Sequence, residues 1–213
     1  MEYIKSKDDG RLLMKLLIYI SIICNLTMAA SQSYGGEGMA SAEDIIKAMD
    51  LKPLPEEGGY YRETYRSDYG TNPARLFGIN ADSDRNVSTA IYYLISKGSF
   101  SAIHRIKSDE IFHFYAGDPI EMLQIDEQGN KKIIIMGNDV LNGQEPQIVV
   151  PRNHWQALRL VEGGSWALMG TTVAPGFEFE DFEVGMREQM LELFPQHRED
   201  IIRFTRESHE KAH

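Results

Sequence analysis

The chain has 213 residues, of which 42% are hydrophobic, and it carries a formal net charge of −10. This length and hydrophobic content predict one domain with a sizeable core. The negative charge argues against nucleic acid as a partner, because phosphate backbones attract clusters of lysine and arginine.

The first 30 residues have the layout of a secretory signal peptide. Basic residues precede an apolar run over residues 16–24, and the small residues Ala29 and Ala30 follow it. The run is shorter than the roughly 20 residues of a membrane span, so we expect no stable span in the mature chain. Residues 1–30 therefore predict a secreted or periplasmic protein, whereas a start of translation at Met39 would give a cytoplasmic one.

A glycine-containing stretch over 31–41 is predicted to be a linker. Ser41 is a good N-cap for the short helix that follows, because its hydroxyl can accept from a free backbone N–H of the first turn. Alternating tyrosines and charged residues over 60–66 predict a strand. The polar, turn-rich segment 67–87 is predicted to be a long loop.

From residue 88 on, short apolar segments separated by turns predict a sandwich or barrel. The expected strands are 88–95, 101–106, 110–115, 120–126, 131–136, 147–150, 155–161, 165–173 and 177–183. Apolar residues at helical spacing then predict two helices within 185–207, separated by Pro195 and packed outside the barrel. Residues 42–208 are thus expected to form a single domain, followed by a short tail over 209–213.

Two adjacent predicted strands bring a histidine and a carboxylate together. His104 lies on the first of them, and Glu110 lies on the second, which is otherwise aromatic. A lone strand histidine is most often structural, but a glutamate is seldom buried without a polar partner. His113 is an odd number of residues from Glu110, so an unbroken strand directs it to the opposite face. The sequence therefore predicts His104 and Glu110 as half of a metal site or as an acid–base pair.

These residues belong to a regular spacing, Gly98-x5-His104-x-Ile106-x3-Glu110-x6-Gly117. It resembles the first conserved motif of the cupin superfamily, G-x5-H-x-H-x3-E-x6-G, with isoleucine in place of the second histidine.

A second segment, Pro151-Arg152-Asn153-His154-Trp155-Gln156, resembles the second cupin motif, P-x-G-x2-H. Gln156 stands at the position of its metal-binding histidine. Two of the four usual metal ligands are therefore replaced in this chain.

Further segments are similar to one cupin-like family of unsettled function: 57–67, 89–94, 104–110, 112–119 and 173–179. The resemblance covers roughly residues 42–207. It implies an all-β fold, the cupin double-stranded β-helix or jelly-roll barrel, with a short N-terminal helix and C-terminal helices packed outside. It also implies a homodimer and a small-molecule ligand inside the barrel.

The expected ligand-binding residues are Gln156, which can donate and accept, the aromatic residues Tyr92 and Phe112, and Arg62, which can hold an anion or form an ion pair. Trp155 lies on the opposite face of its strand from Gln156, so it is an alternative wall residue or a dimer-interface residue.

Three functions remain open at this point. Relatives similar in shape to deoxysugar epimerases imply an isomerase or epimerase of a sugar-like or polar carbonyl compound, with His104 as base and Glu110 orienting it or acting as acid. A non-catalytic small-ligand-binding protein is the alternative. A metal-dependent dioxygenase or hydrolase would need His104, Glu110 and Gln156 to hold a divalent metal, and glutamine is a weak ligand. We therefore expect no cofactor or a weakly bound divalent metal.

Overall fold

The computed structural model describes residues 40–71 and 85–207. All named strands and helices belong to one compact unit, which begins at Ser41. The predicted signal peptide, most of the linker and the C-terminal tail lie outside the described residues, so these boundaries, the export and the homodimer stay predictions. Among the described residues, no helix is long and apolar enough to cross a membrane.

Two antiparallel sheets make up most of this unit. The spatial order of the first sheet is β1 (Lys52–Pro53), β2 (Tyr60–Arg66), β5 (Thr89–Ser96), β12 (Trp166–Ala174), β7 (Asp109–Gly117) and β10 (Gln147–Val150). The order of the second is β13 (Glu183–Val184), β6 (Phe100–Arg105), β11 (Trp155–Leu160), β8 (Ile120–Ile125) and β9 (Lys131–Met136). A separate pair is formed by β3 (Gly70–Thr71) and β4 (Arg85–Asn86).

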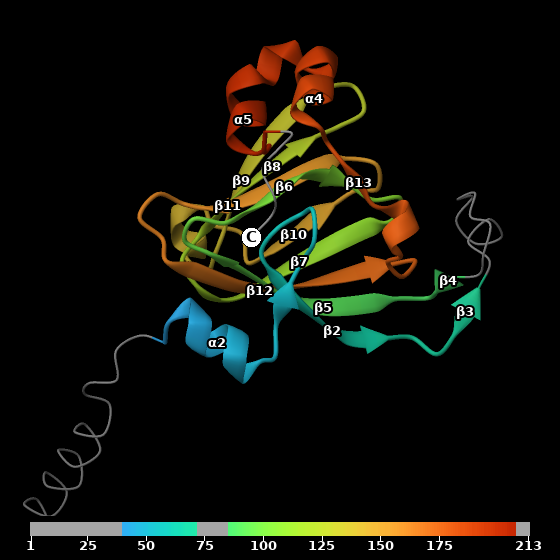
Figure 1. Ribbon diagram of the computed structural model, residues 1–213, viewed down its shortest axis with the longest axis vertical. Coiled ribbons are helices and arrows are strands. Elements are labelled where there is room, and N and C mark those ends of the chain that lie inside the picture. Colours follow the sequence, from blue (N-terminus) through green and yellow to red (C-terminus); the bar gives the residue numbers. More distant parts are fainter. Residues whose placement is uncertain (1–39, 72–84, 208–213) are drawn as a thin grey trace, which may run out of the picture. The chain divides into compact units, whose positions relative to one another are not determined.

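The chain crosses repeatedly from one sheet to the other. Strand β5 lies in the first sheet, β6 in the second, β7 in the first, β8 and β9 in the second, β10 in the first, β11 in the second and β12 in the first. Figure 1 shows the resulting pair of facing sheets. This winding is a jelly roll, so the predicted all-β cupin-type fold is confirmed.

The main core lies between the two sheets and follows the period-2 alternation of the strands. Tyr93, Phe112 and Met169 reach it from the first sheet, and Met122 and Leu158 reach it from the second. All five side chains are almost completely buried.

Helices cover the outer faces of both sheets. Helix α2 (Ala42–Ala48) packs on the first sheet beside Leu94, and its N-cap Ser41 forms the expected capping box with Asp44. Helices α4 (Arg187–Leu193) and α5 (Arg198–Arg203) pack on the second sheet (Figure 1). The remaining helical elements are single 3₁₀ turns: η2 (Val140–Asn142), η3 (Phe179–Asp181) and η4 (Pro195–His197).

Two predicted segments differ from the structure. The predicted strand 177–183 is instead η3 followed by the two-residue strand β13. Ion pairs with Arg85 and Lys107 hold Asp181 within η3, and only β13 joins a ladder, with β6. The predicted loop 67–87 contains the β3–β4 pairing within its described ends.

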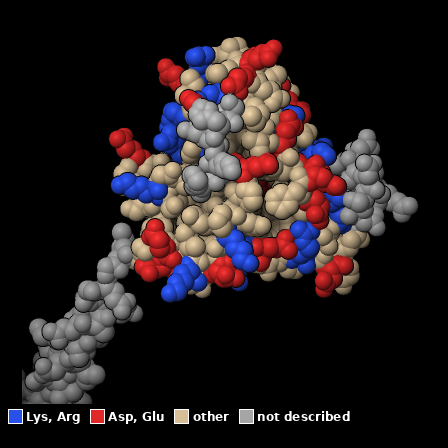
Figure 2. Space-filling view, in the orientation of Figure 1, with Lys and Arg blue, Asp and Glu red and all other residues tan. Residues whose placement is uncertain are grey.

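Charged side chains of both signs lie on the described surface (Figure 2), and the absence of a nucleic-acid partner stays a prediction. Figure 2 shows acidic and basic side chains interspersed on the face in view, with no broad basic patch among the described residues there. Phosphate backbones are bound through such patches.

Candidate functional site

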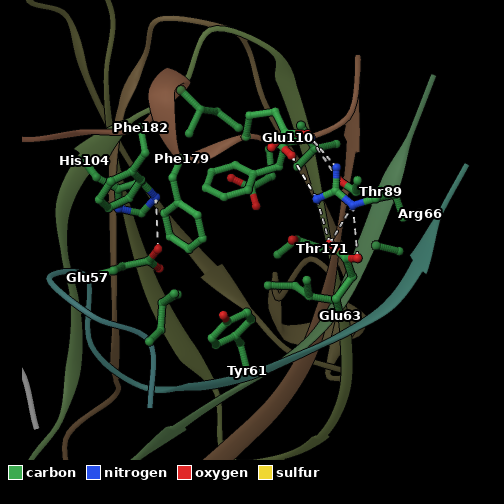
Figure 3. Close-up of a pocket in the computed structure, with 17 residues that line it drawn as sticks. Glu57, Tyr61, Glu63, Arg66, Thr89, His104, Glu110, Thr171, Phe179 and Phe182 are labelled. Atoms are coloured by element: carbon green, nitrogen blue, oxygen red, sulfur yellow. Dashed lines mark hydrogen bonds and ion pairs between the residues drawn. The ribbon is translucent and has the colours of Figure 1, made fainter. Parts of the chain in front are cut away.

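A cavity of about 320 Å³ opens between the sheets at one end of the barrel. Its wall combines ionisable side chains, among them His104 and Glu110, with apolar and aromatic ones. In Figure 3, His104 and Glu57 lie on one side of this pocket, and Arg66 and Glu63 lie on the other. The structure thus places the two predicted catalytic residues in the same cavity.

The imidazole of His104 is held in a defined orientation. Its Nδ1 lies 2.8 Å from the backbone oxygen of Ala102, and the side chain is buried. Because a carbonyl oxygen only accepts, Nδ1 carries the proton, and in the neutral ring Nε2 keeps a lone pair. That Nε2 lies 3.8 Å from Oε2 of Glu57, and the ring of Phe182 lies 5.2 Å from the imidazole, centroid to centroid.

Glu57 is a site residue to which the sequence analysis assigned no role. It lies in the turn before β2, where Gly58 and Gly59 adopt positive φ angles of 99° and 72°. A Cβ atom at Gly58 would lie 2.5 Å from the backbone oxygen of Phe100, so only glycine fits there. The turn directs the Glu57 carboxylate inward, where its Oε1 accepts a 2.8 Å hydrogen bond from Ser101 Oγ. The two glycines that follow Glu57 were the sequence signal that could have indicated this turn.

Glu110 and Gln156 meet from opposite sheets. Gln156 Nε2 donates to Glu110 Oε2 at 2.6 Å, and both side chains are buried. Burial raises the pKa of Glu110, and the nearby Glu57 carboxylate raises it further, while His104 opposes the shift. The neutral acid is therefore favoured more than in water.

The amide of Gln156 has a second, unused face. Its Oε1 is buried and has no hydrogen-bond partner in the described part of the chain. When Glu110 is protonated, turning the amide over lets the acid donate to this oxygen, so the pair accommodates either protonation state. Glu110 can thus act as an acid or as an acceptor without losing its partner.

Arg66 takes the place at the pocket that was predicted for Arg62. A β-bulge between Glu63 and Tyr65 shifts the register of β2 against β5, so Glu63 and Arg66 both reach the pocket although they are three residues apart. Arg62 lies before the bulge and opposite Tyr92, on the outer face of the sheet. The bulge is a local irregularity that period-2 reasoning does not find.

None of the four predicted ligand-binding residues lines the pocket. Gln156 is completely buried and contacts the pocket wall through its bond to Glu110, and Arg62, Tyr92 and Phe112 lie elsewhere. Tyr92 packs on the outer face, and the Arg62 guanidinium lies 5.5 Å from its ring centroid. On β5 the inward positions are those of Tyr93 and Ile91, so Tyr92 has the wrong parity. Phe112 does face inward, but it is buried in the apolar core beyond the cavity.

Two other side chains behave as the alternation of their strands implies. Trp155 lies on the face opposite Gln156, buried beneath the C-terminal helices, with the Arg105 guanidinium 4.5 Å from its ring centroid. His113 bonds Thr172 and Gln147 and does not line the pocket. Its predicted exclusion from the site agrees with this position.

The aromatic wall comes from the segment after β12. Phe177, Phe179 and Phe182 line the pocket, and the ring of Phe177 makes edge contacts with the other two, at centroid distances of 5.2 and 6.4 Å. The predicted strand would have placed Phe182 on the opposite face from Phe177 and Phe179, so the sequence did not indicate that all three line the pocket.

The donor set does not fit a resident metal. Within the described ranges no group of three His, Cys, Asp or Glu side chains is arranged to hold an ion. Of the three residues considered, His104 and Glu110 are good ligands, whereas Gln156 could offer only its amide oxygen, a weaker donor than imidazole. A structural or catalytic ion generally needs at least three protein ligands on one centre.

Comparisons with known proteins match this chain to one family model and to a similar yeast protein. The sequence profile described as Cupin superfamily (DUF985) matches residues 43–185. An uncharacterized protein of Saccharomyces cerevisiae is 32% identical over 132 residues, which are 59% of this chain and 66% of that protein's length.

Two solved structures are also similar. A Shewanella oneidensis protein has a TM-score of 0.71 and 31% identity over 80% of this chain and all of its own. A hypothetical protein from Leishmania major has a TM-score of 0.72 and 31% identity over 79% of this chain and all of its own.

Proposed function

Because the chain belongs to the cupin superfamily, in the family DUF985, we propose that its pocket binds a small polar molecule and transfers protons on it. The activity would be that of an isomerase or epimerase acting on a sugar-like or other polar carbonyl compound. One observation carries the proposal: His104 Nδ1 is bonded to a backbone carbonyl, which leaves the Nε2 lone pair beside the Glu57 carboxylate at the pocket.

The geometry supports an acid–base mechanism that needs no metal. His104 Nε2 removes a proton from the carbon next to the substrate carbonyl, and the anionic Glu57 stabilises the imidazolium that forms. The electron pair moves onto the carbonyl oxygen, which receives a hydrogen bond or a proton from neutral Glu110. Return of the proton from the imidazolium to the neighbouring carbon gives an isomer, as Glu110 takes a proton from the hydroxyl that becomes the new carbonyl. An epimer forms if the enediol turns over in the pocket before the same imidazolium returns the proton to the original carbon.

A non-catalytic binding protein is the second candidate. The observation that favours it is the 2.6 Å bond between Gln156 and Glu110, which holds the acid in a satisfied resting pair. In that case the pocket would release every ligand unchanged.

Solvent isotope exchange separates the two candidates. The protein is incubated in D₂O with a panel of aldoses, ketoses and their amino derivatives, and deuterium uptake at carbon is followed by proton NMR. We expect exchange above the buffer rate for at least one compound, and a loss of at least about 100-fold in His104→Gln. The matched control is His113→Gln, a half-buried strand histidine outside the pocket, which should exchange like the wild type.

Two results would contradict the isomerase proposal. One is exchange that persists unchanged in His104→Gln. The other is binding of panel compounds without any exchange above the buffer rate, which would leave the binding protein as the function.

A further inference from the structure

We infer that the ligand of this pocket carries a protonated amine and no anionic group. This inference rests on the proposed function only for the location of the site, because it concerns binding and not turnover. Three features of the wall support it: the state of its arginine, its balance of charge and its aromatic rings.

The arginine of the wall has no donor left for an anion. A guanidinium has five N–H donors, and Arg66 directs all of them to protein acceptors. The partners are the carboxylates of Glu63 and Glu178, the side-chain oxygen of Asn86 and the backbone oxygen of Phe177. A carboxylate or phosphate on the ligand would have to displace one of these bonds.

The rest of the wall is acidic. Four glutamates line the pocket, Glu57, Glu63, Glu110 and Glu178, against one arginine and one histidine. Burial raises the pKa of Glu110, but the other three carboxylates still outnumber the one arginine. In a partly enclosed cavity, such an excess attracts cations and repels anions more strongly than in bulk water.

The shape and hydrogen-bonding capacity of the wall also match an amine. Nε2 of His104, which has a lone pair in the neutral ring, and Oε2 of Glu57 are 3.8 Å apart, and an ammonium group supplies donors and no acceptor. The rings of Phe177, Phe179 and Phe182 form an aromatic wall, and a cation is stabilised over the face of such a ring. A protonated amine thus meets complementary groups on both kinds of surface.

The test uses three fragments that are matched in size and differ in charge: benzylamine, benzyl alcohol and benzoate. Their affinities for the full chain at neutral pH are measured by NMR titration. We expect benzylamine to bind at least about tenfold more tightly than benzoate, with benzyl alcohol between them. Equal affinities, the reverse order, or no binding of benzylamine up to its solubility would overturn the inference.

A variant that removes one ion-pair partner of Arg66 gives a second, independent test of the charge preference. Glu63→Gln removes a charge that pairs with Arg66, so benzoate should bind several-fold more tightly and benzylamine more weakly. The control is Glu183→Gln, which breaks an ion pair of comparable exposure with Arg105 outside the pocket lining and should leave both affinities unchanged. Equal effects of the two variants would contradict a charge effect inside the pocket.

The two proposals fail separately. Preference for the amine with no isotope exchange in any compound would remove the isomerase and keep the ligand class. Exchange on neutral or anionic sugars without preference for the amine would keep the isomerase and remove the proposed ligand class.

Discussion

The two ends of the barrel interior are built by the same strands but differ in chemistry. Along β7 the inward residues are Phe114 and Phe112 at one end and Glu110 at the other. Along β12 they change in the same direction, from Met169 to Thr171. The apolar end is a closed core, whereas the polar end is the open pocket.

This contrast separates stability from function along each strand. At the closed end, burial of large apolar side chains stabilises the fold. At the open end, buried groups such as His104 and Gln156 lose hydration and depend on their hydrogen-bond partners. Side chains with the same inward parity are therefore expected to respond differently to substitution, according to the end of the barrel at which they lie.

The largest expected effect lies in the closed core. Phe112→Ala should lower the free energy of unfolding by about 3–5 kcal/mol, because it removes a fully buried ring and leaves a cavity. Urea denaturation measures the loss. Phe182→Ala, at the half-buried pocket wall, is the comparison and should lose much less. Equal losses would mean that the pocket end is packed as tightly as the core.

Much of the fold could be predicted because it depends on local pattern. Alternation and turn glycines located β2, β9 and β10 at their observed bounds. The segment 177–183 was predicted wrongly because its position depends on Arg85, which is distant in sequence and pairs with Asp181. Such a contact leaves no periodic signal.

The site was predictable only where a spacing motif marks it. His104 and Glu110 were found through that motif, and the structure places both in one pocket. Glu57 reaches it through a glycine turn, and Arg66 through a β-bulge. The positions of Glu57 and Arg66 depend on backbone irregularities, which a rule of strict alternation does not predict. Tyr92 was chosen for its aromatic ring and not for its parity, and it lies on the outer face.

The next effect concerns the turn that carries Glu57. Arg206 donates to the backbone oxygens of Glu56, Glu57 and Phe100, each at 3.0 Å, so it ties the C-terminal segment to this turn. Arg206→Met should lower the free energy of unfolding by about 1–3 kcal/mol. It should also slow isotope exchange, because Glu57 loses its fixed position near the catalytic base.

The control for that variant is Arg203→Met. Arg203 is also on the C-terminal segment, but its ion pairs with Glu121 and Asp200 are partly exposed, and such pairs contribute about 0–1 kcal/mol. Thermal denaturation and exchange rates are compared for both variants. If Arg206→Met loses stability but exchanges at the wild-type rate, Arg206 stabilises the fold without positioning Glu57.

A smaller loss of stability is expected from a substitution in helix α2, outside the barrel interior. Ser41→Ala removes the N-cap of α2, whose hydroxyl accepts from the Asp44 backbone N–H. The loss in free energy of unfolding should be about 1 kcal/mol, as measured by thermal or urea denaturation. Fragment affinities should not change, since α2 packs on the outer face of the first sheet. A change in benzylamine affinity would show coupling between that face and the pocket.

The last prediction concerns Glu110, at the polar end of the barrel interior, and the pH dependence of its contribution to stability. Burial raises the pKa of Glu110, so the folded state prefers the neutral acid. Its contribution to stability is fully present below the pKa of an unfolded glutamate and is lost as the pH rises through the higher folded-state pKa.

Glu110→Gln provides the comparison, because its side chain stays neutral at every pH. Urea denaturation from acidic to neutral pH should show similar stabilities for the two proteins at the acidic end. The free energy of unfolding of the wild type should then fall relative to the variant as the pH rises. Phe112→Ala, in contrast, should lower stability by a similar amount throughout that range, since a core cavity does not titrate. A wild type that gains stability over the variant with rising pH would mean that the bonds to ionised Glu110 outweigh its burial. The polar end would then stabilise the fold as an anion site and could not supply the neutral acid that the proton-transfer mechanism uses.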